Sequence, residues 1–315
     1  MAINIPEWYI EAWARNVMLL AQQMESTLMD TVFLGDGAVP PGSEKALDII
    51  EPSDGEEIMG SPPRFGPTGN IATVEARRWI ERRTFRWPKL VDRHDQLQTL
   101  HQLNNVYARL ASAALARFKD RVVIGNTGMT VAAFSDLRGG LLGAVTQGNE
   151  TKTLVPFDTT NQLIPGAAAN LTQAKIVAAR AKLEENDYDA GLHGPIYFAY
   201  HATQLNALLN DPTLTSQDYV SVRSLMKGEA VGGLMGFEWR RCNRLPKVGT
   251  IRRNVAWAKN AMEFATWEEQ LQRLTERDDL NYTPQLYLES VYGCSRGDDK
   301  LVVAIDVDES AAVGT

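Results

Sequence analysis

The order of predicted elements along the chain indicates an α+β fold, because helical and strand patterns dominate different parts of it. Helical patterns cover residues 6–33 and 95–119, the stretch between them has few core residues, and strand patterns dominate from residue 236 onward. With 315 residues, 44% of them hydrophobic, the chain can bury a substantial core and form two interleaved domains.

The two early helices are predicted from apolar residues at three- and four-residue steps. In 6–33 the pattern runs from Ile10 to Val32, and in 95–119 it runs from Leu97 to Leu115. Residues 125–166 are rich in Gly, Thr and Asn, which predicts loops with short strands. Further helices are expected at 171–187, after residue 201 and at 214–229, with five strand patterns following Gly236.

Charge and cysteine content exclude several classes of protein. The net charge of −7 gives no support to a protein that coats nucleic acid. The two cysteines, Cys242 and Cys294, lie far apart without metal-ligand spacing, so we expect neither a disulfide nor structural zinc. We find no signal peptide and no uncharged apolar run of about 18 residues, which predicts a soluble protein without a membrane partner.

A strong charge asymmetry marks the region between the two early helices. Residues 44–57 carry six acidic side chains, and residues 75–93 carry seven basic ones against three acidic. We interpret them as an acidic arm and an arginine-rich hairpin that contact neighbouring copies of the chain. The expected contact residues are Arg77, Arg78, Arg82, Arg83 and Arg86. A solvated surface, or single-stranded nucleic acid stacking on Trp79, Phe85 and Trp87, remains an alternative.

Signals for catalysis are weak. The run Val122–Thr130 lacks the known phosphate-loop patterns, and no nucleophile elbow occurs. His94 and His101 are seven residues apart, which is not the usual spacing of metal ligands on a helix. Paired acidic residues such as Asp298–Asp299 lie near predicted turns, so solvated surface is the default interpretation. We therefore predict no enzyme activity, no cofactor and no metal.

The second half of the chain resembles the major capsid proteins of tailed bacteriophages, which have the Hong Kong 97-type fold. The resemblance lies in the order of "LTQAKIVAARAKLEEND", "QLNALLND", "LTSQDYVSVRSLMKGE", "GLMGFEW" and "NRLP". The closing segment, from "RLTERDD" to "VVAIDVD", also matches the family. The similarity is close over residues 170–308 and looser over 75–120.

The resemblance implies a division of the chain into five parts. It implies an N-terminal arm (1–54), an extended loop lying across a neighbouring subunit (55–90) and a peripheral domain with a spine helix at 95–119 (91–166). An axial domain (167–266) and return strands of the peripheral domain (267–315) would follow. His201 lies at a strand–helix junction where relatives carry a small polar residue, and we expect it to cap the helix.

The implied function is structural. Copies of the chain would form hexamers and pentamers of an icosahedral head shell that encloses double-stranded DNA, assembled in the host bacterial cytoplasm. The expected partners are a scaffolding protein, a portal and a decoration protein. A separate scaffolding protein is expected because only 50 to 60 residues precede the loop, too few for the built-in scaffolding domain of some relatives.

Some relatives crosslink their shells through a lysine on the extended loop. No lysine lies between Lys45 and Lys89, so we expect a non-covalent shell. Replacing Arg82 and Arg83 together by Glu is predicted to impair assembly without unfolding the subunit. An encapsulin-like compartment and a soluble α/β enzyme centred on His201 or the Gly125–Gly128 loop are the alternatives.

Overall fold

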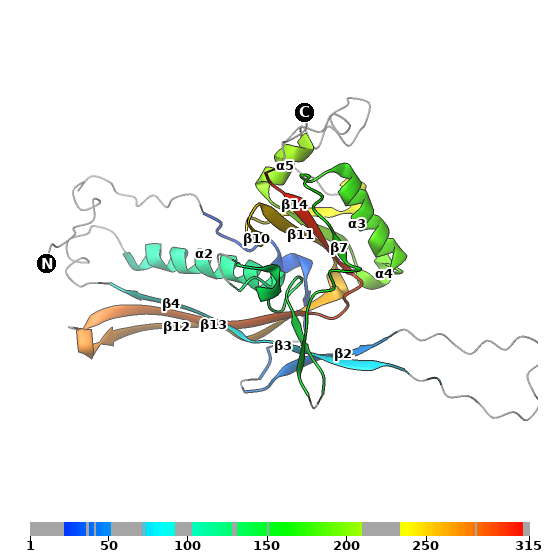
Figure 1. The fold of residues 1–315 in the computed structure, drawn as a ribbon. Coiled ribbons are helices and arrows are strands. Elements are labelled where there is room, and N and C mark those ends of the chain that lie inside the picture. The colour runs from blue at the N-terminus through cyan, green and yellow to red at the C-terminus, as the bar shows by residue number, and fades with distance from the viewer. Residues whose placement is uncertain are drawn as a thin grey trace, which may run out of the picture.

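Three sheets and one long helix form the body of the molecule (Figure 1). The computed structural model describes residues 22–35, 38–40, 42–51, 71, 73–91, 103–127, 131–149, 151–209, 234–280 and 282–310. The elements keep their labels from Figure 1. Residues 6–21 of the helix predicted over 6–33, and the helix predicted at 214–229, lie outside the described residues.

The largest sheet has six strands and is buried on both faces. Its order is β7-β14-β11-β8-β9, with β10 paired to β11. The strands are β7 Leu163–Ile164, β8 Ile196–Tyr200, β9 Glu238–Arg241, β10 Lys247–Val248, β11 Ile251–Ala258 and β14 Val302–Asp308. The two-residue period of a strand sends Tyr197 and Ala199 into one core, and Phe198 and Tyr200 into another.

The second core lies between this sheet and helices α3 (Gln173–Glu185) and α5 (Ala202–Leu209). Ile176, Ala179 and Leu183 of α3 are fully buried in it. The short α4 (Ala190–His193) follows α3. The predicted helix at 171–187 and the helix after His201 are therefore confirmed.

The second sheet has the order β1-β12-β13-β4 and carries helix α2 (Leu103–Ile124). The strands are β1 Phe33–Leu34, β4 Arg83–Leu90, β12 Met262–Arg277 and β13 Thr283–Arg296. Figure 1 shows α2 running along β4, β12 and β13. Phe118 of α2 lies 5.2 Å from Phe85 of β4 and 6.4 Å from Tyr292 of β13, measured between ring centroids.

The third sheet, β2-β3-β5-β6, is smaller. Its strands are β2 Lys45–Ile50, β3 Glu75–Ile80, β5 Val145–Gln147 and β6 Thr153–Val155. Ile80 packs with Val39, Ala265 and Trp267 in a small core that connects this sheet to β12. The remaining helical turns are η2 Met29–Thr31, η3 Phe134–Asp136, η4 Leu234–Gly236, η5 Lys259–Ala261 and η6 Asp278–Leu280.

The structure corrects two predicted helices. The helix predicted over 6–33 is wrong for its described part, because residues 22–34 form an irregular segment with η2 and β1. Helix α2 continues past residue 119 to Ile124, since Val122, Val123 and Ile124 are buried in the first core. It ends at Gly125, whose φ of 93° and close neighbour, the Gly139 carbonyl oxygen, leave no room for a side chain.

The strand pairing corrects two predicted boundaries. The arginine-rich segment is not one hairpin, because β3 pairs with the acidic strand β2 whereas β4 pairs with β13. The extended hairpin therefore begins at Lys45, inside the predicted arm. The final strand, β14, was expected among the peripheral return strands, but it pairs with β7 and β11 in the six-stranded sheet.

Candidate assembly surfaces

Two strand pairs extend from the body in opposite directions (Figure 1). We call β12 and β13 the long ribbon, and β2 and β3 the loop ribbon. The long ribbon is paired from Met262↔Arg296 to Arg277↔Thr283, with register shifts near Glu268. Its base is buried. Toward its far end most β12 side chains are exposed and those of β13 are half-buried, with exposed fractions of 61% for Leu274 and 64% for Tyr282 in the connection between the strands.

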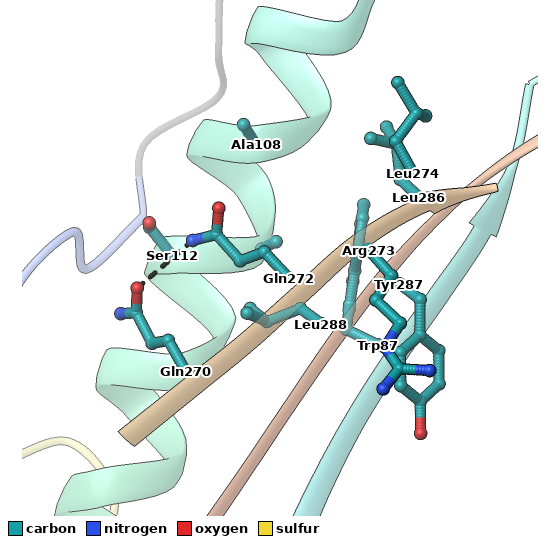
Figure 2. A pocket seen from close by; sticks show the side chains of 11 residues that line it. Trp87, Ala108, Ser112, Gln270, Gln272, Arg273, Leu274, Leu286, Tyr287 and Leu288 are labelled. Carbon is teal, nitrogen blue, oxygen red and sulfur yellow. Dashed lines mark hydrogen bonds between the residues drawn. The ribbon is translucent and has the colours of Figure 1, made fainter. Parts of the chain in front are cut away.

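A hollow of about 360 Å³ lies between α2 and the long ribbon (Figure 2). Small helix residues, including Ala108 and Ser112, face Leu286 and Leu288 of β13 across it. Gln272 donates a hydrogen bond to Gln270 at its edge, at 3.1 Å. The described residues that line this hollow include no carboxylate, histidine or cysteine, so it has the composition of a packing surface.

The loop ribbon neutralises part of the charge asymmetry within the chain. Asp48 faces Arg77 across the strand pair, and the guanidinium donates to both carboxylate oxygens at 2.5 and 3.1 Å. This hydrogen-bonded partner holds the pKa of Asp48 below its usual value. Ile50 and Val74, at the far end of the ribbon, are exposed. The acidic and basic segments thus meet inside one subunit, and apolar side chains remain free at the ribbon's end.

The five predicted contact arginines have different environments. Arg82 is exposed, with its guanidinium 5.9 Å from the Trp267 ring centroid, and Arg86 is exposed and paired with Glu289 at 3.2 Å. Arg83 is half-buried and donates to the carbonyls of Gly125, Asn126 and Arg138. Burial lowers the pKa of Arg83. These carbonyls belong to the loop that follows α2, so Arg83 joins this loop to β4, whereas the last carbonyls of the helix, those of Val123 and Ile124, accept from the Leu141 and Leu142 backbone.

Arg78 belongs to a buried ion network that the sequence did not reveal. Its guanidinium donates to both carboxylate oxygens of Asp299, at 3.0 and 2.6 Å, and Asp299 also accepts from Arg296. Arg296 is fully buried and donates to the carbonyls of Leu141 and Gly143. The interpretation of Asp299 as solvated surface is therefore wrong.

His201 lies immediately before α5. The ring Nδ1 of His201 accepts from the Thr203 backbone N–H at 3.3 Å, and the His201 backbone N–H donates to Gln204 Oε1 at 2.8 Å. Burial lowers the pKa of His201, which favours the neutral ring that this acceptor role requires. Gln204 in turn exchanges two hydrogen bonds with buried Asn254 of β11. His201 thus has the geometry of an N-cap residue.

Glu309 is the nearest carboxylate to His201, at 3.9 Å. It accepts from Thr203 at 2.9 Å and pairs with Arg252 and Lys247, each at 2.5 Å. Burial opposes ionisation, but these donors outweigh it and lower the Glu309 pKa to about 2. A carboxylate held so firmly by cations is a poor proton acceptor, so Glu309 does not suit a role as a catalytic partner of His201.

The other features weighed in the sequence carry no chemistry in the described parts of the chain. Cys242 and Cys294 are buried and free, and burial raises the pKa of the Cys242 thiol to about 12. Across the described ranges, no three metal-binding side chains gather. Val122–Ile124 form the last turn of α2, whereas Gly128–Thr130 and both His94 and His101 lie outside the described residues. The helices that the structure describes are too short or too polar to cross a membrane.

A body with two projecting ribbons and exposed apolar side chains near their ends is the geometry of a self-assembling structural protein. The chain matches the family model of the phage capsid protein over residues 5–309. It belongs to that family. A search of the curated proteins found no match.

Solved structures of phage capsids share the fold at low sequence identity. A structure from Mycobacterium phage Che8 is 16% identical, with a TM-score of 0.63 over 99% of this chain and 100% of that one. The capsid of the Cyanophage P-SCSP1u is 16% identical, with a TM-score of 0.65 and coverage of 94% and 92%. The capsid of Ralstonia phage GP4 is 12% identical, with a TM-score of 0.64 and coverage of 98% and 97%. The chain is a tailed-phage major capsid protein of the Hong Kong 97-type fold, and it forms the head shell.

Proposed function

We propose that the shell is held together by non-covalent contacts made through the long ribbon and the loop ribbon. The observation that carries this proposal is the exposure of Leu274 and Tyr282 on one ribbon and of Ile50 and Val74 on the other. Such side chains lose contact with water when a neighbouring copy covers them, at about 25 cal/mol per Å² of apolar area. Closed shells repeat each contact many times, so modest contacts suffice.

The arginines divide into assembly and folding roles in this proposal. Arg77, Arg82 and Arg86 have outward-facing guanidinium groups that can pair with carboxylates of a neighbour. Arg78 and Arg83 serve the fold of their own subunit. The double replacement of Arg82 and Arg83 is therefore a poor test of assembly.

The matched pair of single variants separates these roles. Arg82→Glu should lower the yield of shells in electron micrographs while leaving the urea midpoint of unassembled subunits unchanged. Arg83→Gln should lower the urea midpoint, because three carbonyls lose a charged donor. Normal shells from Arg82→Glu, or an unchanged midpoint for Arg83→Gln, would contradict this division.

The particle built from these contacts encloses double-stranded DNA in this proposal, with hexamers and pentamers as its units and assembly in the host bacterial cytoplasm. The five-part division of the chain, with the hairpin beginning at Lys45 and β14 in the six-stranded sheet, and the portal, scaffolding and decoration partners belong to the same proposal. DNA extracted from nuclease-treated particles tests the content, and expression with and without a candidate scaffolding protein tests the assembly partner. Empty mature particles, or uniform shells from the chain alone, would count against the respective parts.

The absence of a loop lysine makes the non-covalent nature of the shell directly testable. Mature particles boiled in detergent should run as a single band at the subunit mass of 34.9 kDa. A ladder of heavier bands would show covalent links and overturn this part of the proposal.

A further inference from the structure

Two adjoining hollows meet at the C-terminal end of α2, with volumes of about 380 and 370 Å³. They share Arg121 and Asn126 in their linings. The first also has Arg244, Lys247 and Arg252 in its wall, and the second has Arg83. We call the combined space the arginine hollow. The described residues that line it include five cationic side chains and no carboxylate, in a chain whose net charge is −7.

Some of these cations already have partners. Lys247 and Arg252 both pair with Glu309, and Arg83 is held by backbone carbonyls. Arg121 and Arg244 differ, because no carboxylate in the described part of the chain lies within ion-pairing distance of either. The Arg244 Nε is buried without a hydrogen-bond partner. A buried donor without an acceptor is costly, and the positive charge of this guanidinium also has no counter-charge among the described residues.

The positive charges also act on one another. Burial lowers the pKa of Arg121, and the charges of Arg244 and Arg117 lower it further. Asp120, the adjacent carboxylate on α2, is fully buried and accepts from Ser26 and the Thr27 backbone. An anion in the hollow would therefore relieve a repulsion that no neighbouring acid of the described chain relieves.

We propose that the arginine hollow binds a phosphate group. Arg121 at the end of α2 and Arg244 in the loop after β9 supply planar, charged donors, and the Asn243 amide beside Arg244 adds a neutral donor. Donors converging from two segments suit the oxygens of a tetrahedral phosphate. The phosphate has two sources, the backbone of DNA or a free phosphate ion, and only the DNA source rests on the proposed packaging function.

The test uses full-length unassembled subunits and calorimetric titration with inorganic phosphate at constant ionic strength. Wild type should bind phosphate saturably, and Arg244→Gln and Arg121→Gln should each weaken binding at least about tenfold, because each removes a charge-assisted contact. Arg109→Gln is the control, since Arg109 is an exposed arginine on the same helix. Circular dichroism confirms that each variant is folded, and Arg244→Lys should retain part of the affinity.

A second arm with a short DNA duplex distinguishes the sources. If DNA occupies the hollow, duplex should compete with phosphate, and Arg244→Gln should reduce the salt slope of DNA binding by about 1. Phosphate binding without competition by DNA supports the site with a free ion as its occupant. No saturable phosphate binding, equal binding by all variants, or loss of assembly in Arg244→Gln at unchanged phosphate affinity would overturn the proposal. Particles without DNA would refute packaging while leaving the phosphate titration intact.

Discussion

The Asp299 side chain balances the charge of two arginines inside this subunit. It is the carboxylate shared by Arg78 and Arg296, two arginines from different sheets. Burial by itself would raise the Asp299 pKa, but the charge of Arg296 and the hydrogen bonds from both arginines outweigh it and lower the pKa. Removing this carboxylate would leave two guanidinium groups buried without a counter-charge.

Asp299→Asn should destabilise the unassembled subunit by about 3 kcal/mol, because breaking a buried ion pair costs more than its net contribution. Asp48→Asn is the control, since Asp48 makes an equally bidentate arginine pair on the exposed loop ribbon. Urea unfolding should show a clear loss for the first variant and little measurable change for the second. Similar values for both would mean that the Asp299 network is solvated.

The lowered pKa of Glu309 predicts how the free energy of unfolding depends on pH. Its pKa of about 2 in the folded chain lies below the ordinary value of 4.5, so its contribution is present above pH 4.5 and is lost as pH falls toward 2. Glu309→Gln should reduce the difference between the unfolding midpoints at pH 5 and pH 3, to which other carboxylates with lowered pKa values, such as Asp299, also contribute. A variant with the wild-type pH dependence would assign that dependence to other carboxylates.

At the scale of elements, contacts between sheets limit which residues the strands can carry. Gly293 of β13 lies against the turn between β3 and β4, where a Cβ would come within 2.5 Å of the Glu81 carbonyl oxygen and 2.9 Å of the Trp267 ring. The absence of a side chain therefore lets the loop-ribbon sheet meet the long ribbon.

Gly293→Ala should destabilise the subunit by about 3 kcal/mol, because backbone atoms cannot make room for the added methyl group. Gly297→Ala is the matched control, since the nearest atoms to its Cβ would be 3.8 Å away. Thermal unfolding of both variants provides the comparison. A tolerated Gly293→Ala would mean that the two sheets separate easily at this point.

Elements with a local signal could be predicted from the sequence, and those defined by distant partners could not. The alternation through Ile196, Phe198 and Tyr200 reveals β8, and helical spacing reveals α3. The sheet that contains β14 depends on pairing with β11, about fifty residues earlier, and no local pattern encodes that choice. Asp299 was missed for the same reason, because its partner Arg78 is 221 residues away in the chain.

At the scale of the whole molecule, the long ribbon links folding to assembly. Leu274 is 61% exposed in one subunit, so changing it costs the isolated fold little. Leu274→Asp should therefore reduce the yield of shells strongly while the unfolding midpoint of unassembled subunits stays near that of wild type. Leu274→Met, which keeps an apolar side chain, should assemble normally. Equal yields from the two variants, measured by sedimentation of particles, would place this face away from any contact.

The six-stranded sheet has one more consequence. Its two faces belong to different cores, and one of these cores also contains α2 and the base of β12 and β13. The two cores meet at this sheet, so we expect the described body to move as one rigid unit. Subunits at positions of different curvature in the head would then differ mainly in the bending of the long ribbon and the loop ribbon, while the body between the ribbons keeps one conformation.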